Sequence, residues 1–169
     1  MVSRLAMVVG AVAVVLLLGG AVPAMAAGGG GGGGEPTGKP QDPDYTAALR
    51  AIDGKKFAEA IPLLEKVVAR DPRNADAYNQ LAYATRRNGD AAKAVPIYEK
   101  ALAIDPKHRD AHEYIGEAYL VLDDLPKAKQ HLAALDKLCF LPCEQYSDLK
   151  KAVEAYEKSG GKSKPLAGK

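Results

Sequence analysis

The chain repeats itself at intervals of 34 residues, and this period limits its fold more than any other feature of the sequence. Asp71-Pro72 recurs as Asp105-Pro106, and Asp76-Ala77 recurs as Asp110-Ala111. Several single positions keep the same interval, namely Ala60, Pro62, Glu65, Lys66 and Ala69, which return as Ala94, Pro96, Glu99, Lys100 and Ala103. A period of this length indicates a stack of similar units, in which each unit completes the core of its neighbour.

The apolar residues within each unit have helical spacing. The intervals i, i+3, i+4 and i+7 describe Tyr78, Leu81, Ala82 and Thr85, and again His112, Ile115, Gly116 and Tyr119. A turn follows each segment, at Asn88-Gly89-Asp90 and at Asp123-Asp124, and the last aspartate of each suits the N-cap of another helix. We therefore predict second helices at 91–104 and 125–138, so that each unit is a pair of antiparallel helices.

These offsets resemble the tetratricopeptide repeat family, whose unit carries W-x2-L-G-x2-Y, then A-x3-F, then P. The second unit supplies Tyr78, Leu81, Ala82, Thr85, Ala94, Tyr98 and Pro106 at these places, and the third supplies His112, Ile115, Gly116, Tyr119, Ala128 and Leu132. In the third unit Phe140 holds the proline position, and the proline comes later as Pro142. The resemblance implies an all-α, right-handed solenoid of three helix-turn-helix repeats at 41–74, 75–108 and 109–142.

The register of the first unit stays open. This unit keeps small or apolar residues at the family positions Ala48, Ala60 and Leu64, and it keeps Pro72. However, Asp44 and Ala51 stand where the family has large aromatic residues. A second apolar stripe, made of Tyr45, Ala48, Leu49 and Ile52, is compatible with a first helix rotated by about one residue.

The N-terminal segment has the order of a secretory signal peptide. Arg4 precedes an apolar run over residues 5–22, and Ala24-Met25-Ala26 fits a cleavage site before Ala27. An uncleaved membrane anchor is the alternative, because a run of 18 residues can just span a bilayer. Residues 27–43 include seven consecutive glycines, and their composition predicts a disordered linker. We expect the mature protein to be exported, in the periplasm or secreted, and not bound to the membrane after cleavage.

The C-terminal part of the chain predicts a cap for the stack. One apolar stripe joins Tyr146, Leu149, Val153 and Tyr156, with Lys and Glu elsewhere, so residues 143–158 are predicted to form a polar-backed capping helix. Residues 159–169 are predicted to be a disordered tail.

The two cysteines, Cys139 and Cys143, are four residues apart and Pro142 lies between them. Proline stops a regular helix here, so the chain turns and the two sulfurs can come within bonding range. In an exported protein we predict a disulfide that holds the capping helix, worth about 2 kcal/mol or less because the closed loop is short. Use of the pair in a periplasmic copper or thiol-redox carrier is the alternative.

The sequence offers few candidates for catalytic residues. The chain has 23 Lys and Arg against 21 Asp and Glu, a balance that shows no electrostatic footprint for nucleic acid. No nucleophile elbow or Ser-His-Asp order stands out. His108 and His112 are four apart, but we expect His108 in a loop and His112 at a packing position. The sequence therefore predicts no enzymatic activity, no cofactor and no metal site.

The resemblance also implies a concave groove, lined by the first helices, that receives peptides or helices of partner proteins. The family's groove positions fall on Asp76, Asn79, Tyr83, Arg86, Asp110, Glu113, Glu117 and Leu120, and on Tyr45, Leu49 and Ile52 if the first unit keeps the family register. Some members clamp a C-terminal carboxylate with basic residues, and Glu113 and Glu117 argue against such a clamp.

The charges of these positions predict a groove of mixed sign whose C-terminal half is acidic, suited to a partner that carries Lys or Arg. We expect Glu113 and Glu117 to be solvated, so that replacing both with Lys would change stability by less than about 0.5 kcal/mol. The sequence thus predicts a scaffold or assembly factor of the bacterial envelope, with its partner and oligomeric state open.

Overall fold

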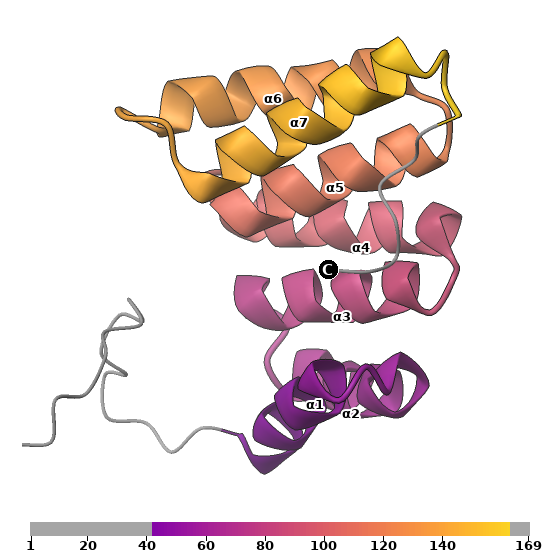
Figure 1. Ribbon diagram of the computed structural model, residues 1–169. Coiled ribbons are helices and arrows are strands. Elements are labelled where there is room, and N and C mark those ends of the chain that lie inside the picture. The colour runs from indigo at the N-terminus through magenta and orange to yellow at the C-terminus, as the bar shows by residue number, and fades with distance from the viewer. Residues whose placement is uncertain (1–41, 163–169) are drawn as a thin grey trace, which may run out of the picture. The chain divides into compact units, whose positions relative to one another are not determined.

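The computed structural model describes residues 42–162. Within this range the chain forms helices and no strand: α1 (Pro43–Asp53), α2 (Phe57–Arg70), α3 (Ala75–Arg87), α4 (Ala91–Ile104), α5 (Arg109–Val121), α6 (Leu125–Leu138) and α7 (Glu144–Lys158). Each odd-numbered helix up to α5 packs against the helix that follows it, and α7 packs on α5 and α6 (Figure 1). The predicted all-α stack of helix pairs is confirmed, and α4 and α6 have the predicted bounds.

The predicted signal peptide lies outside the described residues, as do most of the predicted linker and the last seven residues of the predicted tail. The prediction was wrong for the linker's last two residues, because the Asp42 carboxylate caps α1 and Pro43 occupies its first turn. It was also wrong for the start of the tail. There Gly160 and Gly161 adopt positive φ angles of 61° and 84°, and the Gly161 N–H donates to the Tyr156 carbonyl, which closes α7.

Local signals at the helix ends recur from repeat to repeat. Side chains at the N-caps of α3 to α6 accept hydrogen bonds from backbone N–H groups: Asn74, Asp90, His108 and Asp124. The turn between the two helices of each repeat has one residue with positive φ, at Lys55, Gly89 and Asp123, with angles of 57°, 102° and 62°. These three residues are 34 apart, so the same turn is rebuilt three times with different side chains.

Small side chains allow the helices to approach one another closely. The repeated alanines have 0% exposure: Ala48, Ala60, Ala82, Ala94 and Ala128. Gly116 takes the place of Ala48 and Ala82 in the third repeat, and a Cβ added there would lie 2.6 Å from Leu149 Cδ2. Leu149 belongs to α7 and is fully buried, so the capping helix packs directly on the backbone of α5.

Burial in α1 settles the register of the first repeat. Ala48 and Ala51 are buried, at the places that Ala82 and Thr85 hold in the second repeat. The family register therefore holds. The rival stripe shares Ala48 with it, and the other residues of that stripe, Tyr45, Leu49 and Ile52, are only half-buried.

The core consists of two clusters of buried side chains. The first joins α1 and α2 to Leu81 and Ala84, and the second extends from Ala82 to Tyr156 on α7. Ile97 packs against both clusters and links them. Among the helices of residues 42–162, none combines the length and the hydropathy that a membrane span requires.

Candidate functional site

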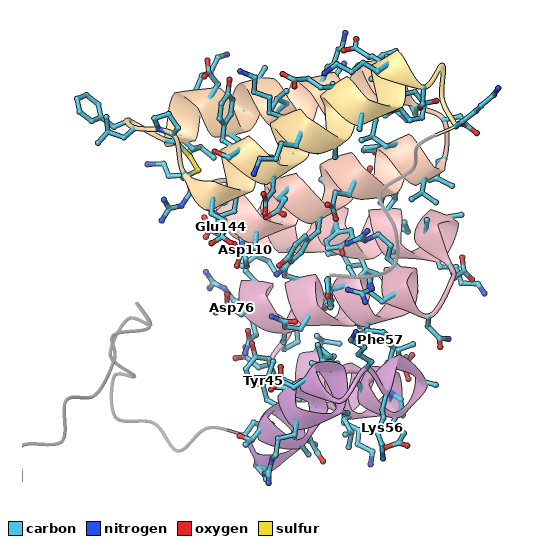
Figure 2. All side chains as sticks on the ribbon, viewed as in Figure 1. Tyr45, Lys56, Phe57, Asp76, Asp110 and Glu144 are labelled. Carbon is cyan, nitrogen blue, oxygen red and sulfur yellow. A yellow bond between two sulfur atoms is a disulfide. The ribbon has the colours of Figure 1, made fainter. Side chains whose placement is uncertain are left out.

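The first helices of successive repeats lie side by side. Helix α3 contacts both α1 and α5, and α5 contacts α7, so these four helices share one face. Figure 2 shows Tyr45, Asp76, Asp110 and Glu144, one from each of these helices, along one edge of that face. The three acids are 34 residues apart and lie in the first turns of α3, α5 and α7, where a negative charge is favourable next to the helix dipole.

A pocket of about 330 Å³ opens between α3, α5 and α7. Five of the predicted groove residues line it, namely Tyr83, Arg86, Asp110, Glu113 and Glu117. Its other lining residues were not predicted: Arg87, Tyr114, Glu144, Gln145 and Asp148. The interval of 34 could have identified Glu144, because it places this residue in register with Asp110 on a fourth first helix.

The remaining predicted groove residues do not line this pocket. Asn79 is 1% exposed and Leu120 is 0% exposed, so both are packing residues. Asp76 is exposed, and one of its carboxylate oxygens lies 3.1 Å from His108 Nε2. In the first repeat Tyr45 and Ile52 pack against the N-terminal cluster, and Leu49 is half-buried. Burial, together with the charge of Asp76, raises the pKa of Tyr45 to about 12.

Aromatic rings hold the two arginines of the pocket in place. The rings of Tyr83 and Tyr114 are 5.0 Å apart, and Arg86 Cζ lies 5.7 Å and 5.8 Å from their centroids. Arg87 Cζ lies 4.7 Å from the centroid of the Phe57 ring, and its Nη1 donates to the Tyr83 hydroxyl. Cations over aromatic faces are attracted by the negative charge of the ring surface. Both guanidinium groups are therefore positioned before any ligand arrives.

A buried ion pair crosses from α3 to α5. Arg86 Nη2 donates to Glu117 Oε2 at 2.8 Å, and the side chains are only 4% and 12% exposed. The expectation that Glu113 and Glu117 are solvated was wrong, since these residues are 6% and 9% exposed. The long side chains of the two helices meet here and leave little room for water between them.

The pocket carries opposite charges on its two sides. Its two arginines come from α3, whereas its carboxylates come from α5 and α7: Asp110, Glu113, Glu117, Glu144 and Asp148. Gln145 Nε2 donates to Asp110 Oδ1 at 2.7 Å and so connects α7 to α5 on the acidic side. This distribution agrees with the predicted groove of mixed sign and acidic C-terminal half.

The side chains of His108 and His112 have different partners. His108 is the N-cap of α5, where its Nδ1 accepts from the Ala111 N–H. His112 instead meets His131 of α6, with 3.0 Å between their Nδ1 atoms. Sequence reasoning missed this pair because the two residues are 19 apart on different helices. Within residues 42–162, histidine, cysteine and carboxylate side chains form no group of three or more that could hold a metal ion.

The predicted disulfide between Cys139 and Cys143 is present, with 5.8 Å between their Cα atoms. It closes the turn between α6 and α7. Both sulfurs are used in this bond, so in this state the pair offers no thiolate to a metal. The closed loop presents two exposed apolar side chains, Phe140 at 100% and Leu141 at 73%.

Comparison with known proteins points to one repeat family. Two family models, both described as tetratricopeptide repeat, match residues 45–108 and residues 86–138. No curated protein sequence matches the chain.

Several solved structures have a similar fold. The chain is 28% identical to MamA 41-end from Desulfovibrio magneticus RS-1, with a TM-score of 0.55, over 56% of this chain and 54% of that one. It thus spans little more than half of the MamA chain. PcrH in complex with the chaperone binding region of PopD is 17% identical, with a TM-score of 0.62, over 69% and 90% of the two chains. The first TPR domain of human RPAP3 is 23% identical, with a TM-score of 0.62, over 69% and 91%.

The burial of the Arg86–Glu117 pair leads to a prediction about the free energy of unfolding. Glu117→Ala leaves the Arg86 guanidinium buried without its counter-charge, so we expect the free energy of unfolding to fall by about 3–5 kcal/mol in urea denaturation. The control is Glu154→Ala on the exposed side of α7, which should change it by less than about 0.5 kcal/mol. Equal values for the two variants would mean that the pair is solvated. The double variant Arg86→Met, Glu117→Leu removes both charges and should recover most of the loss.

The His112–His131 pair generates a pH prediction. Burial, with a smaller contribution from charge on His112, lowers the pKa of His131 from its ordinary 6.5 to about 4. Between these values the unfolded chain binds a proton that the folded chain does not, so stability should fall as the pH drops from about 6.5 to about 4. His131→Gln should have a flatter profile of unfolding free energy against pH.

The other histidine with a shifted pKa does not obscure this comparison. Burial alone would lower the pKa of His108, but the Asp76 carboxylate outweighs it and raises that pKa, which gives the opposite dependence on pH. His108 is present in both proteins, so the difference between their profiles isolates His131. Parallel profiles would contradict the prediction.

Proposed function

The chain belongs to the tetratricopeptide repeat family, and from this premise we propose that it is a non-enzymatic interaction module that binds a segment of another protein. The observation that carries the proposal is the pocket of about 330 Å³ between α3, α5 and α7. Its rings and guanidinium groups are already held in place, and pre-organised side chains lose little conformational freedom on binding. The PcrH structure, in complex with a region of PopD, supports the proposal through its similar fold.

The charges of the pocket define the partner that suits it. A peptide or helix with a Lys or Arg would complement the carboxylates of α5 and α7, above all the exposed Glu144. An apolar or aromatic side chain beside that base would pack on Tyr83 and Tyr114. Such charges raise the association rate more than the affinity, because they act over distance before contact is made.

We further propose that the protein works outside the cytosol, as a scaffold or assembly factor of the bacterial envelope. The signal-like order of residues 1–26 supports this location, and so does the disulfide between Cys139 and Cys143, because such bonds persist in oxidising compartments. We expect N-terminal sequencing of the extracytoplasmic fraction to begin at Ala27. An intact Met1 on membrane-bound protein would instead support the anchor.

Site-specific crosslinking tests the binding face. A photoreactive phenylalanine analogue replaces Glu144, which lines the pocket, or Glu154, which is exposed on the same helix but does not line it. After illumination of intact cells, we expect a discrete protein adduct from position 144 and not from position 154. Equal adducts from both positions, or from position 154 alone, would place the binding surface elsewhere.

The partner identified from the adduct then allows an affinity measurement. Glu144→Gln should weaken its binding about threefold at low salt, and less at high salt where ions already screen the wild-type charge. Glu154→Gln should bind like the wild type under both conditions. An affinity for Glu144→Gln that matches the wild type at low salt would exclude a basic group of the partner at this position.

A further inference from the structure

The hydrogen bonds of His112 define which of its ring nitrogens carries the proton. His112 Nε2 lies 3.1 Å from the Pro106 carbonyl oxygen, which can only accept, so Nε2 carries the proton. In the neutral ring Nδ1 therefore has a lone pair, and His131 Nδ1 lies only 3.0 Å away. His131 Nδ1–H must then be the donor, because two lone pairs at this distance would repel. His131 donates this bond as its Nδ1–H tautomer. Moving that proton to Nε2 leaves a lone pair on both Nδ1 atoms.

The separation of the two nitrogens suits two ligands of one metal ion. Imidazole nitrogens bind such ions at about 2.0–2.1 Å. Two nitrogens 3.0 Å apart then subtend an angle of about 95° at the metal. This is close to the right angle between neighbouring ligands in square-planar or tetragonal geometry, and narrower than the tetrahedral angle that Zn²⁺ prefers.

The surroundings keep both rings oriented. The Pro106 carbonyl holds the outer nitrogen of His112, as backbone carbonyls commonly do for histidines that bind metals. On the other side, the Tyr119 ring stacks on His131 with 5.7 Å between centroids and 15° between planes. The nearby Lys127 ammonium is paired with Asp124 at 3.2 Å, which reduces its repulsion of a cation.

We propose that His112 and His131 form a two-nitrogen binding site for Cu²⁺ between α5 and α6, with water completing the coordination. Cu²⁺ is favoured over Zn²⁺ by the near-right angle and by its higher affinity for nitrogen ligands. The site is separate from the pocket between α3, α5 and α7, since neither histidine lines that pocket. It also differs from the copper site considered for Cys139 and Cys143, whose sulfurs are bonded to each other.

Copper titration of the full chain, made without a histidine tag, tests the proposal. Wild type is compared with His112→Gln, His131→Gln and the matched control His108→Gln, which changes the third histidine of the chain. A free N-terminus can bind Cu²⁺ as well, but it does so equally in all four proteins. We expect wild type and His108→Gln to bind one Cu²⁺ more than either of the other variants. Their electron paramagnetic resonance spectra should show a tetragonal ion with two additional nitrogen ligands.

Thermal melting provides a second measurement. Cu²⁺ should raise the melting temperature of wild type and His108→Gln, because a ligand of the folded state stabilises it. It should not raise the melting temperature of the variants at positions 112 and 131. Two separate substitutions keep the test valid if one of them fails to fold, which circular dichroism reports. The proposal is overturned if a folded variant at position 112 or position 131 binds as many Cu²⁺ ions as the wild type and His108→Gln.

Discussion

Close approach of neighbouring helices at small residues is the constraint on which the rest of the structure depends. Alanines with 0% exposure recur at the contacts within and between repeats, and Gly116 takes this role in the third repeat. With no large side chain in between, helix backbones come near enough for their flanking residues to interlock in a close-packed core. At Gly116 the space that a Cβ would need is filled by Leu149, so the capping helix is part of the same stack and not an appendage.

The polar chemistry of the candidate site follows from this packing. Because the stack places α3 beside α5, the long side chains of Arg86 and Glu117 meet between these helices and lose most of their water. Removing one partner of such a pair costs far more than the pair contributes, because a buried charge is left alone. Arg86 is also bracketed by Tyr83 and Tyr114. The residues that line the pocket therefore also hold two repeats together, so a ligand would meet a surface that is already rigid.

The two proposals use different faces of the third repeat. The pocket draws on α5 residues that face α3 and α7, whereas the histidine pair lies where α5 contacts α6. His112 holds the position of Tyr78 in the second repeat, and His131 holds that of Ile97. The repeat scaffold thus accepts a polar pair at a packing position without a change in helix bounds, because the two rings share a hydrogen bond and the Pro106 carbonyl accepts from the outer nitrogen of His112. A repeat architecture can in this way carry separate chemistry on each face of one unit.

The sequence by itself determined the repeat, the helix bounds of α4 and α6, and the caps at Asp90 and Asp124, and it favoured the disulfide over a metal or thiol-redox role of the two cysteines. Each of these depends on residues close together in the chain or on the period of 34. Only the tertiary structure decided which groove residues are buried, that Arg86 pairs with Glu117, and that His112 meets His131. These contacts join residues 31 and 19 positions apart, on different helices. The periodicity tells which face of a helix a side chain occupies. How near the facing helix lies, and hence whether water or another side chain meets it, depends on how all the helices pack together.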